Sequence, residues 1–331
     1  MNNSIKSNSY RIIVCVGGLA LAVFTNSAAA ADDYPLKPMR VIIGYLPGGP
    51  VDVVLRPLAQ KMTEAIGQPF IIENRPGANG NLGAEFVARA APDGYTLLMG
   101  TMAQLTNNPS LYPKLPFDTA KDFAPISLVA TSPGAVVVHP SLPAQSLKEL
   151  IALAKTRPAK LNFSSSGNGS ANHLAGELFK MLAGVNMTHV PYKGGGPALH
   201  AVVAGEIELI VISLPLSLPF LKANRLRALA LASQKRSALW PQLPTTAEAG
   251  LPGLESNSGP GMLAPAATPK PIITRLHGEI ARATNLPELR ERYIAQGLEL
   301  VANTPDEFAA TIRRETARWS KIIKASNITV D

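Results

Sequence analysis

Three glycine-rich turns are the parts of this chain whose residue types and spacing are best suited to chemistry. They cover residues 46–50, 164–170 and 192–197, and each lies between an apolar run and an amphipathic segment. Glycines let the backbone adopt positive φ and approach a ligand closely. A helix that follows such a turn directs free N–H groups and the positive end of its dipole at the ligand. Three turns of this kind facing one cleft would hold an anion without any catalytic group.

The turn at residues 164–170 carries the richest set of donors. Three successive serines, an asparagine and a fourth serine are interspersed with two glycines. Donors grouped in this way suit a carboxylate, which accepts several charge-assisted hydrogen bonds. An alternative interpretation makes Ser170 only the N-cap of the following helix. The segment also approaches the dinucleotide-binding fingerprint. However, Asn172 stands in place of its third glycine and no acidic residue follows about twenty positions later, so we expect no nucleotide.

Three charged or titratable side chains near these turns have two interpretations each. Asp52 would lie in the first turn of a helix, where it either compensates the helix dipole or contacts a ligand ammonium or a bridging water. Lys193 precedes three glycines and is either a point charge for the anion or a solvated side chain. His173 lies close to the second turn and is a further candidate ligand contact.

The sequence offers no convincing catalytic or metal-binding pattern. None of the five histidines is spaced with cysteine, aspartate or glutamate as metal ligands are. The chain also has neither a nucleophile elbow nor a Walker loop. We therefore predict a binding protein that is not an enzyme and that uses no cofactor and no metal. An exported enzyme is the less favoured alternative.

The first 31 residues are typical of a secretory signal peptide. Lys6 and Arg11 form a basic stretch, residues 12–24 are apolar, and small residues precede a cleavage position near Ala31. The apolar run is short for a membrane anchor, although a retained anchor is the alternative. Because Cys15 is the only cysteine, the mature chain would have no disulfide. The sequence therefore predicts a periplasmic protein whose stability depends on its hydrophobic core.

The charge balance of the mature chain is moderately basic. Removing Lys6 and Arg11 from the 31 basic residues leaves 29 against 23 acidic residues, a net charge near +6. This balance favours small acidic molecules as ligands, and an ordinary basic surface is the alternative. The basic residues are scattered and few aromatic residues accompany them, so we expect no nucleic-acid partner.

Apolar runs and helical periodicity alternate along the chain, which predicts parallel sheets covered by helices. The first helix keeps one apolar stripe in spite of Pro57, and Gly67 ends it. Strands are expected at residues 39–45, 70–73, 95–100, 125–130, 135–138, 161–164, 190–192, 207–213 and 226–232. Helices are expected at residues 51–66, 81–90, 147–155, 171–182, 197–203, 271–283 and 305–326.

About 300 mature residues with this alternation indicate two doubly wound α/β lobes. We expect residues 32–131 and 232–331 to form the first lobe, and residues 132–231 to form the second. The last strand of the second series would carry the chain back to the first lobe. Backbone crossings near residues 130–136 and 227–235 would then form a hinge, with the ligand in the cleft between the lobes.

Six blocks in this order resemble one family. They are Pro47-Gly48-Gly49-x-x-Asp52, Glu73-Asn-Arg-Pro-Gly-Ala78-x-Gly80, Ala91-Pro-Asp-Gly-Tyr-Thr-Leu-Leu98, Gly169-Ser170-x-x-His173-Leu-Ala-Gly-Glu-Leu-Phe179, His189-Val-Pro-Tyr-Lys-Gly-Gly195 and Pro244-Thr245-x-Ala-Glu-Ala-Gly250. Together they resemble the Bug-type solute receptors of tripartite tricarboxylate transporters, over nearly all of residues 35–325.

The resemblance implies a two-lobed periplasmic binding protein fold of the second type, joined by a two-crossover hinge. It implies a monomer that binds a small organic carboxylate and delivers it to membrane transporter subunits. A sensor of the same fold that presents its ligand to a signalling partner is the alternative. Carried over position by position, the ligand site would comprise Tyr45, Pro47, Gly48, Gly49, Asp52, Thr101, Gln104, Ser164, Ser165, Ser166, Gly167, Asn168, Gly169, Ser170, His173, Tyr192, Lys193, Gly194, Gly195 and Ser213.

The chain departs from the family's pattern at three places near the expected cleft. Gly44-Tyr45-Leu46 replaces the family's usual residues before the first glycine turn. Gly259 aligns with a frequent tryptophan, and Ser213-Leu214 aligns with aspartate, glycine or asparagine. Because these changes fall at or near the expected cleft, the identity of the ligand does not carry over from the family.

Overall fold

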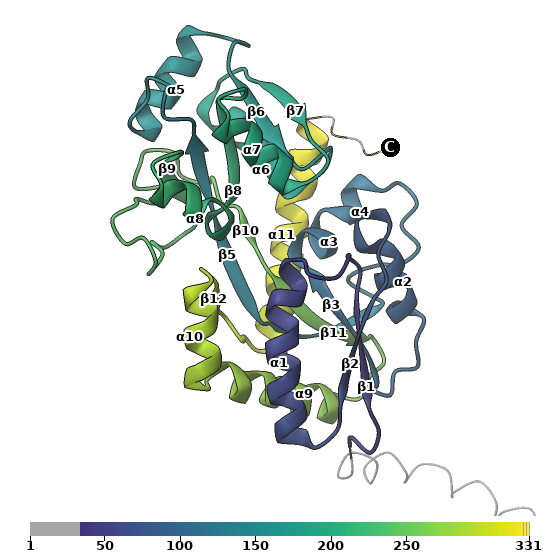
Figure 1. Ribbon diagram of the computed structural model, residues 1–331. Helices are drawn as coiled ribbons and strands as arrows, with labels where there is room; N and C mark the ends of the chain where they lie inside the picture. Colours follow the sequence, from purple (N-terminus) through teal and green to yellow (C-terminus); the bar gives the residue numbers. More distant parts are fainter. Residues whose placement is uncertain (1–33, 327, 329, 331) are drawn as a thin grey trace, which may run out of the picture.

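The computed structural model describes residues 34–326, 328 and 330, which form two α/β lobes, each with its own sheet (Figure 1). The expected signal peptide, residues 1–31, lies outside the described residues. Helices cover both faces of each sheet, which is the arrangement that the alternating pattern predicts. Within the described part of the chain, no helix has both the length and the apolar character needed to cross a membrane.

The first sheet contains β1 (Met39–Ile43), β2 (Phe70–Asn74), β3 (Thr96–Thr101), β4 (Phe123–Leu128) and β11 (Pro260–Pro265). Its order is β2-β1-β3-β11-β4, in which β1 is parallel to β2 and β3 while β11 is antiparallel to β3 and β4. Four of these strands agree with the sequence to within a few residues. We did not expect β11, because its six residues lie in a proline-rich stretch that has no strand pattern.

The side chains of β1 alternate between the two faces of this sheet, as the period of a strand requires. Val41 and Ile43 pack into the core under α1 (Pro50–Ile66), α9 (Lys270–Thr284) and α10 (Pro287–Ala295). Ile42 packs into a second core on the opposite face. That face is covered by α2 (Asn81–Ala88), which follows the turn η1 (Ala78–Gly80), and by α3 (Met102–Thr106), beside α4 (Asn108–Leu111).

Helix α1 shows how local sequence determines the element that follows the first glycine turn. Pro50 occupies its first position, where a missing N–H costs nothing. Gly67 ends it in the left-handed conformation, with φ of 78°, and donates its N–H to Thr63 O at 2.9 Å. Pro57 lies inside the helix, as expected, and is buried together with the apolar stripe.

The second sheet is built around β5 (Ala130–Val138), with β6 (Asn162–Ser165), β7 (Thr188–Pro191), β8 (Leu209–Ser213), β9 (Arg227–Ala232), β10 (Asn257–Ser258) and β12 (Glu299–Leu300). The order is β10-β5-β8-β6-β7, and β9 and β12 also pair with β5. Strands β6, β7 and β8 are mutually parallel, so their carboxyl ends share one edge. The flanking helices are α5 (Leu147–Thr156), α6 (Ala171–Ala183), α7 (Gly195–Val203) and α8 (Leu214–Lys222). Helix α8, which contains Pro215 and Pro219, was not expected.

The strand expected to return the chain to the first lobe does not do so. Strand β9 pairs with β5 along five residues and remains in the second sheet. The following segment also packs there, with Leu243, Leu251 and Leu254 in the cores of the second lobe. The chain crosses first at Val129, between β4 and β5, and again at Gly259, between β10 and β11. The second crossing is therefore about 25 residues later than expected.

Helix α11 (Pro305–Ala325) forms a third link between the lobes (Figure 1). A capping box between Thr304 and Glu307 begins it. Phe308, near its start, is fully buried in the first lobe, whereas Trp319 and Ile323, near its end, belong to the core of the second lobe. One continuous helix therefore contributes to both cores.

Candidate functional site

The expected ligand residues gather where strands of the two sheets end. In open α/β sheets, ligands bind beyond the carboxyl ends of the strands. Tyr45 follows β1 and Thr101 ends β3, while Ser165 and Ser213 end β6 and β8. The two edges approach each other, because a Cβ built at Gly169 would lie 3.1 Å from Leu111 of the first lobe. Two of the three glycine turns thus lie on the second lobe and one on the first.

In the first lobe, Tyr45 and Thr101 are in direct contact. The Tyr45 hydroxyl is 3.0 Å from Thr101 Oγ1 and also donates to Asn79 O at 3.2 Å. Burial raises the pKa of Tyr45 to about 12, so it stays a neutral hydroxyl at physiological pH. Thr101 caps α3 by accepting the N–H of Gln104 at 3.1 Å. These contacts bring Tyr45, Thr101 and Gln104 together as expected.

Gln104 is fully buried and contributes one unused acceptor. Its Nε2 donates to Gly80 O at 2.7 Å, whereas its Oε1 has no hydrogen-bond partner among the described residues. The first glycine turn lies beside this group on the same edge of the sheet. Gly49 is the N-cap of α1 and makes no side-chain capping bond, so the amides of the first helical turn remain free donors. Gly48 has a φ of 81° and no atom near the place of a Cβ.

Of the two interpretations of Asp52, a structural residue of α1 or a ligand contact, this structure shows the structural one. The residue is only 2% exposed, and Arg56 contacts its Oδ1 at 2.5–2.8 Å. Asn74 donates to its Oδ2 at 3.2 Å and to Tyr45 O at 3.0 Å. Both carboxylate oxygens are therefore engaged within the first lobe. Asn74, which belongs to one of the six family blocks but was not among the expected ligand residues, links α1 to the residue before the first glycine turn.

In the second lobe, the turns at residues 164–170 and 192–197 lie side by side. Strands β6 and β7 pair in parallel, and the N–H of Tyr192 donates to Ser165 O at 2.9 Å. A Cβ built at Gly195 would lie 3.3 Å from Ser166 Oγ. Ser166 Oγ donates to Asn172 Oδ1, and Asn172 Nδ2 donates to Val211 O at 2.7 Å. Asn172 therefore ties this turn to β8, a role that its place in the sequence did not reveal.

The serines of the second turn divide into different roles. Ser164 Oγ donates to Ala198 O at 2.9 Å and is fully buried, so it fastens α7 rather than facing a ligand. Ser170 is the N-cap of α6 and accepts the N–H of His173, so the alternative interpretation as a helix cap is confirmed. Asn168 is exposed, so its side-chain amide is the accessible side-chain donor of the turn, whereas the half-buried Ser166 already donates its hydroxyl proton to Asn172.

The remaining expected residues take different positions. Ser213 Oγ is 2.6 Å from Ser132 Oγ of β5, so it joins the end of β8 to the strand that crosses between the lobes. Lys193 is exposed and forms no ion pair with any described residue. His173 is 7% exposed and accepts the N–H of Gly169 through Nδ1 at 3.1 Å. His189, whose ring stacks on His173, was not among the ligand residues expected from the sequence.

Comparison with known proteins identifies the family. The model of the tripartite tricarboxylate transporter family receptor matches residues 54–328. The chain belongs to this receptor family. Protein BugT of Bordetella pertussis is 35% identical over 318 residues, which cover 96% of this chain and 98% of BugT. Members of the family are solute-binding receptors and not enzymes.

Two solved structures share the whole fold with this receptor. R. palustris Rpa4515 with adipate is 36% identical, covers 90% of this chain and 100% of its own, and has a TM-score of 0.79. MatC (Rpa3494) from Rhodopseudomonas palustris, with bound malate, is 32% identical with a TM-score of 0.75, and covers 88% of this chain and 100% of its own. The expected two-lobed α/β fold of periplasmic binding proteins is thereby confirmed.

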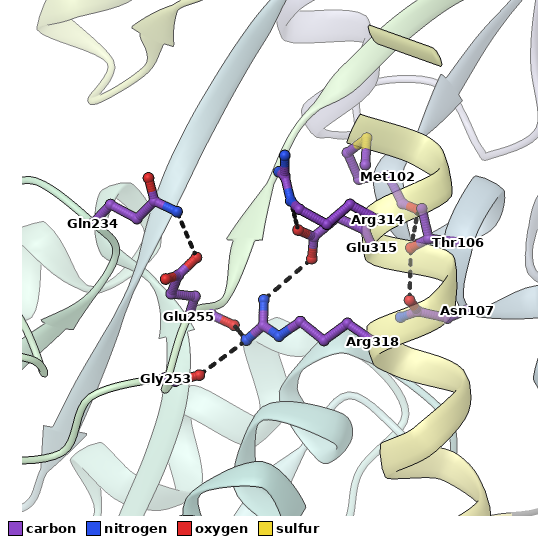
Figure 2. A network of polar contacts seen from close by, with 9 residues as sticks. All are labelled: Met102, Thr106, Asn107, Gln234, Gly253, Glu255, Arg314, Glu315 and Arg318. Atoms are coloured by element: carbon purple, nitrogen blue, oxygen red, sulfur yellow. Dashed lines mark hydrogen bonds and ion pairs between the residues drawn. The ribbon is translucent and has the colours of Figure 1, made fainter. Parts of the chain in front are cut away.

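The receptor also has a cavity of about 240 Å³ beside α11, and no expected ligand residue lines it. Its walls come from α3, α11 and residues 255–258. A polar network borders it (Figure 2). Arg318 donates to Glu315 at 3.1 Å, to Gly253 O at 3.2 Å and to Glu255 O at 2.6 Å. The network therefore attaches α11 to the segment that precedes the second crossing.

Replacing Arg318 by methionine is expected to destabilise the receptor. The change keeps the length of the side chain but removes donors from two backbone carbonyls, and bonds from a charged donor contribute about 1.5–3 kcal/mol each. Since the carbonyls can take up water, we expect a loss of about 2 kcal/mol and a fall in melting temperature of roughly 4–8 °C. Arg313→Met on the exposed face of the same helix is the control. Equal melting temperatures for the two variants in a calorimetric scan would contradict this role.

Proposed function

We propose that this protein is a periplasmic solute receptor that binds a small organic carboxylate between its lobes. In this proposal it delivers the carboxylate to a tripartite tricarboxylate-type membrane transporter. Residues 1–31 act as the signal peptide, and the mature receptor is a monomer. The lobes close about the crossings at Val129 and Gly259, and α11 flexes or shifts with them. A single observation carries the proposal: glycine turns of both lobes lie where strands of the two sheets end, and they present backbone and hydroxyl donors without a catalytic group.

The chemistry of the two edges supports an anionic ligand. In the first lobe, the free amides at the start of α1 are donors, and the neutral hydroxyl of Tyr45 can join them by giving up its bond to Asn79 O. In the second lobe, the donors are the side chain of Asn168 and the backbone amides on either side of Gly167. Lys193 adds a positive charge at the rim. Relatives that share this fold have adipate and malate bound, and both compounds are dicarboxylates. We infer that the ligand belongs to the same chemical class.

Thermal stability of the receptor with added dicarboxylates tests the proposal. A ligand at a hundred times its dissociation constant stabilises the folded state by about 2.7 kcal/mol. For a chain of this size, that corresponds to a rise in melting temperature of roughly 5–10 °C. We expect such a rise with at least one dicarboxylate of four to six carbons, adipate and malate included, and none with the corresponding diamide or diol. A panel in which no carboxylate changes the melting temperature would contradict the proposal.

The sensor alternative differs in its partner and not in its ligand. Deleting the receptor gene should abolish uptake of the labelled carboxylate if the partner is a permease. If the partner is a signalling protein, uptake should persist while the transcriptional response to the carboxylate is lost. Mass spectrometry of the compounds that co-purify with natively released receptor would name the ligand in either case.

A further inference from the structure

Two histidines form a stacked pair behind the second glycine turn. His173 lies on α6 and His189 on β7, and their ring centroids are 3.7 Å apart with 9° between the planes. Phe163 of β6 extends the stack, with its centroid 5.0 Å from that of His189. Two positively charged imidazoles at this distance would repel each other strongly, so the stacked arrangement requires that the two rings are not charged at the same time. The pair therefore behaves as a neutral aromatic unit.

The hydrogen bond of His173 determines its tautomer. The backbone N–H of Gly169 donates to Nδ1 at 3.1 Å, so Nδ1 must present a lone pair. In the neutral ring the proton then lies on Nε2, which is 4.0 Å from Glu177 Oε1. A side chain that carries a proton on Nδ1 cannot accept this bond.

His189 holds the other end of the turn through Ser165. Its Nε2 is 2.6 Å from Ser165 Oγ. The same oxygen accepts the N–H of Gly167 at 3.1 Å and lies 3.1 Å from Gly167 O. Either Nε2 of His189 donates to this oxygen or the Ser165 hydroxyl donates to Nε2, and in both cases the short contact fixes Ser165. The two histidines thus fix Ser165 and Gly169, one residue on each side of residues 166–168.

We propose that His173 and His189 are positioning residues for the carboxylate site, where they act as a clamp that holds the turn at residues 165–169 in its anion-binding shape. This inference rests on the proposed carboxylate-binding function. Neither ring is required to touch the ligand. His173 acts through Gly169 as a hydrogen-bond acceptor, and His189 acts through its short hydrogen bond with Ser165.

The electrostatic surroundings keep the clamp neutral. Burial, and then the positive charge of Lys180, lower the pKa of His173 to about 4. Burial also lowers the pKa of His189 to about 4, with His173 and Lys180 adding to the shift and Glu177 opposing it. Lys180 binds Glu177 at 2.8 Å, which offsets the carboxylate that faces the pair from α6. Both rings are therefore neutral above about pH 5, and protonation of His173 as the pH falls through about 4 removes the acceptor for Gly169.

Nuclear magnetic resonance of the ligand-free receptor tests the clamp directly. We expect the ¹⁵N signals of His173 to show an unprotonated Nδ1 and a protonated Nε2 at pH 7. The amide signal of Gly169 should shift with a midpoint near pH 4, and this titration should be absent in His173→Phe. A Gly169 amide that does not follow the titration of His173 would overturn the inference, whatever the ligand.

Two substitutions of His173 separate positioning from packing. His173→Phe keeps the stacked ring but leaves the buried N–H of Gly169 without its acceptor, so the melting temperature should fall modestly while the affinity for the bound dicarboxylate falls about three- to tenfold. His173→Gln keeps an acceptor and loses the stack, so it should lower the melting temperature and retain more of the affinity than His173→Phe. His200→Asn, an exposed histidine of the same lobe, is the control.

The outcomes distinguish this inference from the proposed function. If the wild-type receptor binds adipate, malate or another dicarboxylate and His173→Phe binds it equally well, the clamp is refuted and the proposed function stands. If no carboxylate binds to the wild type, the proposed function fails, and the Gly169 titration still decides whether the clamp exists.

Discussion

Carboxylate binding is expected to fall about a hundredfold when Gly169 is replaced by alanine. Gly169 has a φ of +71°, a conformation that costs other residues roughly 1–2 kcal/mol. An added Cβ would also lie 2.6 Å from Val330 and 3.1 Å from Leu111. The turn must therefore move, which takes its amides and hydroxyls away from the anion. Loss of two charge-assisted bonds of about 1.5 kcal/mol each gives a factor on the order of a hundred.

Isothermal calorimetry with the dicarboxylate that raises the melting temperature measures this effect. Gly196→Ala is the matched control, because Gly196 lies beside the same site and has no atom within 4 Å of the place of a Cβ. We expect Gly196→Ala to bind like the wild type. If Gly169→Ala also keeps the wild-type affinity, the turn does not hold the ligand and the anion site lies elsewhere.

Replacing Gly44 by alanine is expected to destabilise the receptor more than Arg318→Met does. Gly44 ends the first strand segment where it meets a second backbone, and its Cβ would lie 2.5 Å from Gly80 O and 2.6 Å from Gly80 Cα. A Cβ on Gly83 would likewise lie only 2.9 Å from Gly44 Cα. A backbone cannot rotate aside as a side chain can. The loss of folding free energy should therefore lie near the upper end of the range for overpacked sites, about 3 kcal/mol. The melting temperature should drop by roughly 6–12 °C.

A thermal scan of Gly44→Ala against Gly278→Ala checks this expectation. Gly278 lies in α9 with no atom within 4 Å of the place of a Cβ, so the control should melt at the wild-type temperature or slightly above it. An unchanged melting temperature for Gly44→Ala would show that the contact with Gly80 is not rigid. Tyr45 follows Gly44 directly, so we also expect this variant to bind carboxylate more weakly than its loss of stability alone explains.

Most helices could be predicted from the sequence because their signals are local. The apolar stripe of α1 with Gly67 after it, and the serine N-caps of α5 and α6, are properties of a few neighbouring residues. The glycine turns were readable for the same reason, since a positive φ concerns one residue at a time. Their family resemblance then indicated the receptor class, which the comparisons confirm.

The pairing of distant segments could not be read in this way. Residues 227–232 have the pattern of a buried strand in either sheet, and only the packing of the second lobe places them beside β5. A glycine is required at residue 259 because a Cβ there would overlap the carbonyl of Ala130, where the two crossing segments touch. Strand β11 and helix α8 could not be predicted from their proline-rich sequences, because tertiary packing overrides weak local propensity.

The roles of individual site residues were also decided by tertiary structure. Asp52 has a structural role that the sequence did not reveal, because Arg56 and Asn74 bind its two oxygens within the first lobe. His189 gained a role because pairing of β6 with β7 brings it onto His173, sixteen residues away in the chain. By itself, the sequence determined most of the helices, the glycine turns and their suitability for an anion, all of which depend on neighbouring residues. Only the tertiary structure decided which side chains form hydrogen bonds with each other, because that depends on residues brought together from distant positions in the chain.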